Sequence, residues 1–497
     1  MKGINFHMQC LQMHHIPRGS QHSIAPNMHM LYRISSTIRS RSQSTKFNRL
    51  VTYATTAPPS APPPPSPTLS LPRVVLKGGK TRLFTDNQSP IVYGGAIDRV
   101  VGRPPPNAGD VVLLCNGADE PFAWGVFNPN SMYRVRILDT LLNTDDSISL
   151  DDVVSNRVRA AIAARATLGL LPPPTTATDV YRMVNSEGDR LSGLIVDRLG
   201  PGVAVVQSSA VWIESRREMI SELIKKHAGV DTVVWRQTSE LLKEEGWEVQ
   251  DQDGEGGGGG EGAFDATPGG SSASAATHVV QENGIKYACN PHGQKTGFYC
   301  DQREHRAFIR ALAKDKDVVD ICCFSGGFTL SAAAGGASTA LGIDSSGPAI
   351  ELARENAKLN GFGEDHQSPQ TVSFERADAM QFMRTALSEG KQWDIVVLDP
   401  PKLAPNKKSL QNALRRYESL NAVAMQLVRP GGLLMTCSCS GAVAQSGGEF
   451  ESMLQKASKR ARRKVQVVRK GGAAVDHPLD PGYPEGQYLT NITMIVN

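Results

Sequence analysis

The first 85 residues of the chain contain no aspartate or glutamate, although they hold eleven of its 53 lysines and arginines. Residues 1–50 are also rich in serine and histidine and have no compact apolar segment. This pattern argues against a secretory signal and is typical of an organellar transit peptide. Because a Pro/Ser-rich spacer follows at 57–70, we expect import into a chloroplast in preference to a mitochondrion.

All 49 acidic residues follow residue 85, so the remainder of the chain is acidic by about seven charges, although the formal net charge is +4. A nucleic-acid partner therefore cannot be inferred from overall charge, and local basic clusters would have to provide its binding site.

The sequence also lacks long apolar segments and paired cysteine motifs. No run of eighteen apolar residues occurs, so no transmembrane helix and no membrane partner are expected. None of the eight cysteines forms a CxxC motif, which argues against a structural zinc site. A chain of this length needs no disulfide scaffold, so we expect reduced thiols and no metal.

A chain of 497 residues is too long for one ordinary core, and its composition changes along its length. Short β-prone runs punctuated by Gly, Pro and Asn predict a small β-barrel module. A capped helix at 149–169 and a small α+β unit follow, and a low-complexity Gly-rich stretch comes next. The predicted boundaries are 1–70 (disordered leader and spacer), 71–140 (β module), 141–249 (helix and α+β domain), 250–277 (disordered insertion) and 278–497 (C-terminal domain).

From residue 278, apolar strands alternate with helices, and this pattern predicts a parallel, doubly wound α/β sheet with helices on both faces. The expected strands are 317–323, 337–344, 371–378, 393–400 and 431–438, and the expected helices are 328–335, 348–360 and 409–428.

Polar residues stand at the carboxyl ends of these strands, where open α/β sheets bind ligands. They are Asp320 with the turn FSGGF (324–328), Asp344, Asp378, Asp399 and the pair Cys437 and Cys439. Asp344 follows Asp320 by 24 residues, a spacing at which an acid bonds ribose hydroxyls. The turn lacks the GxGxxG pattern of dinucleotide sites, so a nucleoside such as S-adenosylmethionine fits better. Each acid taken alone is better explained as a helix cap or a solvated strand end, whereas together they favour a cofactor site.

The order of the motifs resembles that of the PUA-domain class I methyltransferases that make 5-methylcytosine in large-subunit ribosomal RNA. The resemblance covers most of 72–497 apart from the Gly-rich insertion. It lies in SPIVYGGAI (89–97), FNPNSMYRVRI (127–137), YRMVNSEGDRLSGLIVDRLG (181–200), KTGFYCDQR (295–303), DICCFSGGF (320–328), DPPKLAPNKKSLQNALRRYESLN (399–421), SCSG (438–441) and DHPLDPGYPEGQYL (476–489).

The resemblance implies a PUA-like RNA-binding domain at 71–140, a Rossmann-like methyltransferase domain and S-adenosylmethionine as cofactor. It implies Cys439 as nucleophile, with Asp399 beside the target base, Asp344 on the ribose and Asp378 on the adenine. The implied cofactor-binding residues are Lys295, Phe298, Asp301, Arg303, Asp320, Phe324, Ser325, Gly326, Gly327, Phe328, Asp344, Asp378 and Asp399.

These residue types suit methylation of cytosine at C5. Attack of a thiolate on C6 makes C5 nucleophilic enough to accept a methyl group, and Asp399 can assist at N3. The target base must be flipped out or single-stranded to react. Two thiols compete for the nucleophile role. We favour Cys439 because it lies further past the strand end, and we expect Cys437 to be packed.

RNA contacts are expected from basic residues near the active-site strand end, namely Lys402, Lys407, Lys408, Arg415 and Arg416. A second basic run, KASKRARRK (456–464), is equally well explained as the solvated face of a helix.

Two other functions remain open. The fold could methylate a guanine nitrogen, with Cys439 structural, or the chain could be a non-catalytic RNA-binding factor in ribosome assembly. The sequence does not decide the oligomeric state, a homodimer included.

Overall fold

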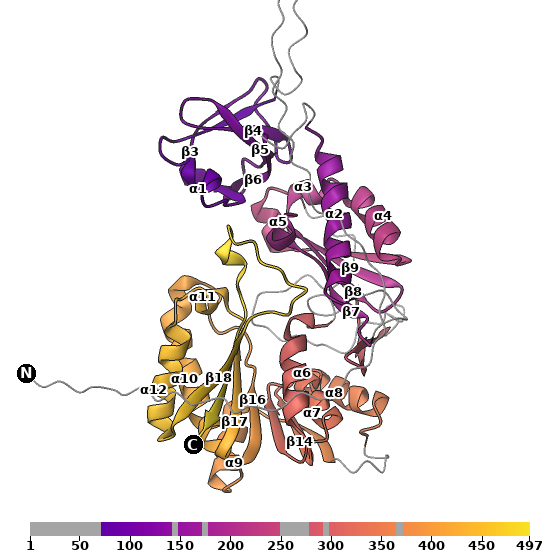
Figure 1. Ribbon diagram of the computed structural model, residues 1–497, viewed down its shortest axis with the longest axis vertical. Coiled ribbons are helices and arrows are strands. Elements are labelled where there is room, and N and C mark those ends of the chain that lie inside the picture. The colour runs from indigo at the N-terminus through magenta and orange to yellow at the C-terminus, as the bar shows by residue number, and fades with distance from the viewer. Residues whose placement is uncertain (1–70, 142–147, 171–176, 249–277, 292–297, 364–370) are drawn as a thin grey trace, which may run out of the picture. The chain divides into compact units, whose positions relative to one another are not determined.

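The computed structural model describes residues 71–141, 148–170, 177–248, 278–291, 298–363 and 371–497 (Figure 1). The predicted leader, the Gly-rich insertion and Lys295 lie outside the described residues. Among the helices of the described ranges, none is both long and apolar enough to cross a membrane.

The N-terminal domain is a six-stranded sheet in the order β2-β6-β5-β4-β1-β3, which confirms the predicted β module. Apolar side chains such as Val112, Leu114 and Val135 are buried inside it, because alternate residues of a strand face the same side. Its elements are β1 (Arg73–Leu76), α1 (Arg82–Thr85), β2 (Ile91–Tyr93), β3 (Ile97–Val101), β4 (Val111–Cys115), β5 (Pro121–Phe127) and β6 (Tyr133–Thr140).

The predicted central helix is α2 (Leu150–Thr167), and Ser149 is its N-cap as expected. The Ser149 side chain accepts a hydrogen bond of 3.2 Å from the backbone N–H of Asp152. The buried positions Leu150, Val154, Val158 and Ala161 recur every three or four residues, so one face of the helix packs on the domain behind it.

Replacing this cap gives a first test of the local structure. Ser149→Ala is expected to lower the free energy of unfolding by about 1 kcal/mol, because the N–H of Asp152 loses its partner. Ser155→Ala, within the same helix, is the matched control and should be neutral or slightly stabilising. Urea unfolding of both variants measures the difference, and equal losses would contradict the capping role.

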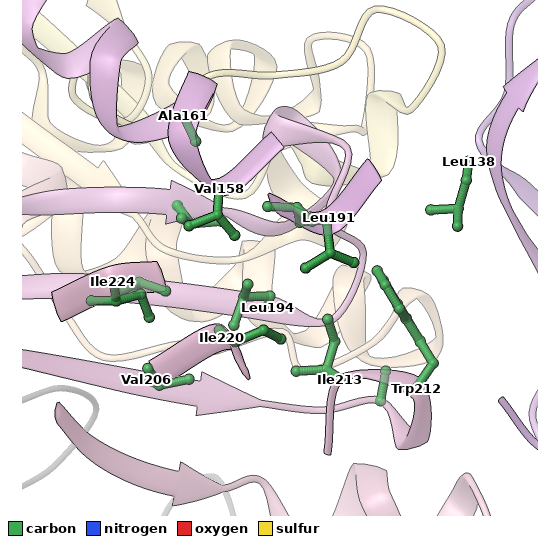
Figure 2. Packing of buried hydrophobic residues seen from close by; sticks show 14 of the residues in the cluster. Leu138, Val158, Ala161, Leu191, Leu194, Val206, Trp212, Ile213, Ile220 and Ile224 are labelled. Carbon is green, nitrogen blue, oxygen red and sulfur yellow. The ribbon is translucent and has the colours of Figure 1, made fainter. Parts of the chain in front are cut away.

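The central domain is a four-stranded sheet in the order β10-β9-β8-β7, with α2 and α4 packed against it. Figure 2 shows Val158 of α2, Ile220 of α4 and Leu194 of β8 converging on one apolar core. The domain comprises β7 (Val180–Asn185), β8 (Leu194–Leu199), β9 (Val203–Ser208), α3 (Val211–Glu214), α4 (Arg217–Ala228), β10 (Thr232–Gln237) and α5 (Ser239–Glu244).

The C-terminal domain begins with the hairpin β11 (His278–Glu282) and β12 (Ile285–Cys289), which the sequence pattern did not predict. A seven-stranded sheet follows, in the order β15-β14-β13-β16-β17-β19-β18. Its strands are β13 (Asp317–Ile321), β14 (Thr339–Asp344), β15 (Thr371–Arg376), β16 (Trp393–Leu398), β17 (Val428–Ser438), β18 (Val465–Gly471) and β19 (Thr490–Val496).

Helices cover both faces of this sheet, as expected for a doubly wound fold. Val318 and Val397 pack towards α6 and α7, whereas their neighbours Val319 and Val396 pack towards α9, α10 and α12. The helices are α6 (Arg303–Leu312), α7 (Gly327–Ala334), α8 (Gly347–Leu359), α9 (Ala379–Ser388), α10 (Leu410–Leu427), α11 (Gly441–Ala444) and α12 (Glu449–Ala461).

One part of the sheet corrects the prediction of parallel strands. β19 runs antiparallel to both β17 and β18, and neither β18 nor β19 was predicted. An antiparallel strand needs no helical crossover, and β19 follows β18 without an α-helix between them, so the alternation of strands and helices does not reveal it.

Candidate active site at the carboxyl ends of the sheet

The turn after β13 has an unusual backbone. Cys322 and Phe324 have positive φ values of 67° and 48°, and Gly326 has 82°. A Cβ at Gly326 would lie 3.0 Å from the Phe374 ring, so glycine is needed for space as well as for conformation. The turn, which includes Cys322, leads directly into the start of α7.

Asp320 lies at the floor of this turn and is 1% exposed. Its Oδ2 accepts hydrogen bonds from the N–H and hydroxyl of Thr329, at 3.0 and 2.9 Å. Its Oδ1 is buried and has no partner within the described part of the chain. Burial raises the pKa of Asp320 from 3.8 to about 7, against the opposing effect of the Thr329 bonds.

The next two predicted acids lie at the ends of β14 and β15, and both bond to backbone. Asp344 accepts from the N–H of Phe324 at 3.0 Å and from that of Ser346 at 2.9 Å, which ties the turn to the neighbouring strand. Asp378 caps α9 by accepting from Gln381 N–H at 2.9 Å. The helix-cap alternative is thus realised for Asp378, and a cofactor role for either carboxylate stays a prediction.

Asp399 follows β16 and is held by a side chain that the sequence analysis did not select. Gln302 donates from Nε2 to Asp399 Oδ2 at 3.2 Å. The other end of its amide, Oε1, lies 2.5 Å from His305 Nδ1. Burial first, and then the charges of two arginines, lower the pKa of His305 to about 3, so the ring is neutral and donates to Gln302. The amide of Gln302 is therefore oriented with its donor side towards Asp399.

The two thiols of β17 have different surroundings. Cys437 is fully buried, packs on the α6 and α7 face and accepts from Asn491 Nδ2 at 3.1 Å. Burial raises the pKa of the Cys437 thiol far above its ordinary value, with smaller contributions from Asp399 and Cys439. Cys439 lies beyond the strand end at Ser438 and is partly exposed. The prediction that Cys437 is a packed residue is confirmed.

Strand register places Cys439 and Asp399 at the same edge of the sheet. Leu398 pairs with Thr436 on adjacent parallel strands, so both residues follow the same edge of the sheet. The segment around Cys439 is anchored on both sides: Ser438 donates to Tyr417 Oη at 3.0 Å, and Ser440 donates to the carbonyl of Ala404.

The residues predicted near the methionine part of the cofactor are only partly placed at that edge. Phe298 is buried, and its ring centroid lies 5.0 Å from that of Tyr287. Asp301 accepts from Tyr488 Oη at 2.8 Å. Phe328 and Ser325 are buried at the start of α7, and Gly327 would meet Arg306 if it had a Cβ.

Arg303 belongs to a buried network whose centre, Asp476, the sequence analysis did not select. Arg303 forms two bonds with the Asp476 carboxylate, of 3.1 and 2.8 Å. The same carboxylate accepts from the N–H of Arg182 in β7 at 2.8 Å, and the Asp476 carbonyl accepts from Arg165 of α2. Asp476 therefore joins the central domain to the methyltransferase-like domain. The signal available in the sequence was its place in the quoted stretch 476–489.

The predicted RNA-binding residues Lys402, Lys407, Lys408, Arg415 and Arg416 are all exposed. Lys402 lies three residues after Asp399, Lys407 and Lys408 lie in the short 3-10 helix that precedes α10, and Arg415 and Arg416 lie in the first two turns of α10. In the second basic run, Arg463 instead donates to four backbone carbonyls and has a structural role there.

Comparisons with known proteins agree with this arrangement. A model of S-adenosylmethionine-dependent methyltransferases matches residues 267–471, and a model of PUA-like domains matches 74–140. The ribosomal RNA large subunit methyltransferase I of Shewanella frigidimarina is 33% identical over 421 residues, which cover 84% of this chain and 98% of that protein. The protein of the same name from Photobacterium profundum is 33% identical over 408 residues, covering 82% and 95%. The chain belongs to this family.

Solved structures show the same fold. A methyltransferase crystallised with S-adenosylhomocysteine aligns with a TM-score of 0.66 over 85% of this chain and 99% of its own, at 16% identity. A Streptococcus mutans methyltransferase aligns with a TM-score of 0.64, also at 16% identity. The protein is an S-adenosylmethionine-dependent methyltransferase with an N-terminal PUA-like domain.

The residues present fit this cofactor. The unpartnered Oδ1 of Asp320, buried beside the glycine turn, suits a positively charged donor such as the ammonium of the methionine part. Gly326 lets the backbone approach a ligand closely, and the acid at the end of β14 suits the ribose.

The raised pKa of Asp320 leads to a prediction about cofactor affinity. The carboxyl group must lose its proton before it can pair as a carboxylate with an ammonium group, and its pKa is about 7. Affinity for S-adenosylmethionine should therefore rise with pH between 5.5 and 7, by up to about tenfold per pH unit, and level off above this. Calorimetry across this range measures it, with a proton released on binding at the lower end.

Asp320→Asn is the control for this prediction. The variant should bind S-adenosylmethionine more weakly and with no rise in affinity over the same range, because the amide does not titrate. A pH dependence equal to that of the unaltered protein would show that another group is responsible.

Proposed function

We propose that the protein methylates a cytosine of large-subunit ribosomal RNA at C5, with Cys439 as the nucleophile. The relatives of the family act on ribosomal RNA of the large subunit, as their names state, and this chain covers nearly their whole length. The observation that supports the atom methylated is the position of Cys439, partly exposed beyond β17 on the same sheet edge as Asp399.

Each residue has a defined step in this proposal. The Cys439 thiolate attacks C6 of the cytosine, and the electron pair of the C5–C6 double bond becomes available at C5. Asp399, oriented by Gln302, holds or protonates N3 and so stabilises the ring during the attack. S-adenosylmethionine, when bound, supplies an electrophilic methyl group. Loss of the C5 proton and elimination of the Cys439 sulfur then restore the aromatic ring.

The proposal is tested by locating the product. Purified protein is incubated with unmodified large-subunit ribosomal RNA and S-adenosylmethionine, and the RNA is analysed by bisulfite sequencing and by mass spectrometry of its nucleosides. A single protected cytosine and a 5-methylcytidine peak are expected. A methylguanosine peak instead would assign the chemistry to a guanine nitrogen. Absence of any methylated nucleoside would favour a non-catalytic role.

We also propose that the protein acts in an organelle, the chloroplast in preference to the mitochondrion. The support is the acid-free, Arg- and Ser-rich composition of residues 1–50. A fluorescent protein fused behind residues 1–70 should enter chloroplasts, and a uniform cytosolic signal would overturn the proposal.

A further inference from the structure

A cavity of about 340 Å³ is lined by residues of the central and C-terminal domains, and its lining includes Phe298 and Asp301 of the residues that the resemblance implies for the cofactor. Its walls come from β7 and the turn after it, from Ile195 of β8 and Gln207 of β9, from residues 298–301, and from the C-terminal segment 477–488. Neither Cys439 nor Asp399 lines it. Its volume is within the range of small-ligand sites.

The cavity is next to the catalytic centre along the chain. Asp301, in its wall, precedes Gln302, which bonds Asp399. Tyr299, also in the wall, stacks edge to face on Phe324 of the glycine turn, with ring centroids 5.2 Å apart. A group bound in the cavity would therefore lie close to a base that reacts at Cys439.

The walls combine aromatic rings with hydrogen-bond acceptors. The rings are those of Phe298, Tyr299, Tyr483 and Tyr488. Glu187 and Asp480 supply carboxylates, and Asn185 and Gln207 supply amides. Bases of single-stranded RNA stack on aromatic side chains, and carboxylates accept from the amino groups of bases.

The charges of the walls exclude a phosphate as the bound group. Among the described residues, Arg182 is the arginine that lines the cavity, and its guanidinium is paired with the buried carboxylate of Asp197. Glu187 and Asp301 would repel an anion, whereas Asp480 lies 3.9 Å from the guanidinium of Arg190. The lining suits an uncharged ring that donates hydrogen bonds.

The cavity is also built rigidly. Asn185 Nδ2 donates to the carbonyl of Pro478 at 2.9 Å, and a Cβ at Gly188 would lie 1.9 Å from that oxygen. Arg182 N–H donates to Asp476, as described above. The opposite walls are thus joined at two points, and a ligand would bind without having to order them.

From these observations we infer that the cavity holds an amino-bearing nucleobase of the RNA that neighbours the target nucleotide and is splayed out of the strand. Tyr483 stacks on this base and Glu187 accepts from its amino group. The inference rests on the proposed function, because it assumes an RNA substrate at the adjacent site. In this inference the central domain recognises the RNA sequence around the target nucleotide.

The test uses the full chain and an RNA fragment that contains the methylated cytosine located above. Abasic nucleotides replace, one at a time, the two positions on either side of that cytosine. One abasic position should raise the KM for RNA, and Tyr483→Ala should raise it similarly on the intact fragment, by roughly 5- to 150-fold for a lost stack. On the RNA lacking that base the two proteins should have equal KM values.

A second variant tests the carboxylate and covers the case in which Tyr483→Ala fails to fold. Glu187→Gln keeps an acceptor for the Ser192 hydroxyl, which lies 2.7 Å from Glu187 Oε1. It should raise the KM for the intact RNA but not for RNA in which the recognised base lacks its amino group. Tyr483→Phe, which keeps the ring, should recover tight RNA binding. Glu218→Gln, an exposed acid on α4 away from the cavity, is the matched control.

The outcomes separate this inference from the proposed function. If the unaltered protein yields no 5-methylcytidine, the proposed function fails. If it methylates the RNA but Tyr483→Ala and Glu187→Gln leave the KM unchanged, or raise it equally on every abasic fragment, the cavity does not hold a neighbouring base. Loss of affinity for S-adenosylmethionine in either variant would likewise overturn the inference, because the cavity would then serve the cofactor.

Discussion

Cys439→Ser is expected to abolish formation of 5-methylcytidine, lowering the rate by roughly three orders of magnitude or more, because a serine hydroxyl is a far weaker nucleophile than a thiolate. The affinity for S-adenosylmethionine should be unchanged, since the predicted cofactor residues lie on other strands. Calorimetry and methylation assays on the same preparation measure both quantities.

Cys437→Ala is the matched control, two residues away on the same strand. Cys437 packs in the core, so its replacement should cost stability through a small cavity while methylation continues. The opposite result, an active Cys439 variant with an inactive but folded Cys437 variant, would transfer the nucleophile role to the buried thiol.

A substrate analogue gives an independent measurement of the covalent step. RNA carrying 5-fluorocytidine at the target position has no C5 proton to lose, so the sulfur cannot be eliminated after methyl transfer. The unaltered protein should form a complex with this RNA that survives denaturing electrophoresis, and Cys439→Ser should not. Failure of both proteins to form it, with methylation of ordinary RNA intact, would rule out a thiol mechanism.

Asp476→Ala is expected to lower the free energy of unfolding by about 3–5 kcal/mol, because the buried guanidinium of Arg303 loses both bonds to this carboxylate and keeps the 3.3 Å contact with Glu304. The Arg303 and Asp476 side chains are 5% and 0% exposed, so water cannot replace the lost bonds. Urea unfolding followed by tryptophan fluorescence measures the loss. Glu485→Gln, an exposed acid in the same C-terminal segment, should stay within about 0.5 kcal/mol of the unaltered protein.

The pH dependence of stability checks the same contact. Burial alone would raise the pKa of Asp476, but the hydrogen bond and charge of His477 and the pairing with Arg303 outweigh it, so the pKa is lowered. A lowered pKa contributes stability that is present above the pKa of the unfolded chain, about 3.9, and is lost as the pH falls below it. The unaltered protein should lose this contribution in acid, whereas Asp476→Ala should lack it at every pH.

Most elements of the C-terminal domain could be predicted because their signals are local. Alternating apolar residues mark a strand wherever it will pair, and Ser149 caps α2 with an N–H three residues away. The parallel order of the strands predicted that one edge of the sheet would carry Asp320, Asp344, Asp399 and Cys439.

The contacts that hold these side chains could not be predicted, because they join distant parts of the chain. Gln302 and Asp399 are separated by 97 residues, and Asp476 reaches across 294 residues to Arg182. Nothing in the composition around Gln302 distinguishes an amide that orients a carboxylate from one exposed to water. The antiparallel strand β19 was not predicted for a related reason. Its place in the sheet depends on which strands it pairs with, and the periodicity of the sequence does not show this.

One segment, GGLLMTCSCSG (431–441), illustrates which properties the sequence determines and which the tertiary structure determines. By itself the sequence determined that an apolar strand ends at a pair of thiols, at the sheet edge where a methyltransferase binds its ligands. The sequence also predicted Cys437 to be packed and Cys439 to lie past the strand end, but only the tertiary structure showed that α6 and α7 are the helices that bury Cys437. The tertiary structure alone also enclosed a cavity, whose walls come from five separate parts of the chain. Burial and enclosure depend on which distant residues pack around a side chain, and local sequence does not specify those neighbours.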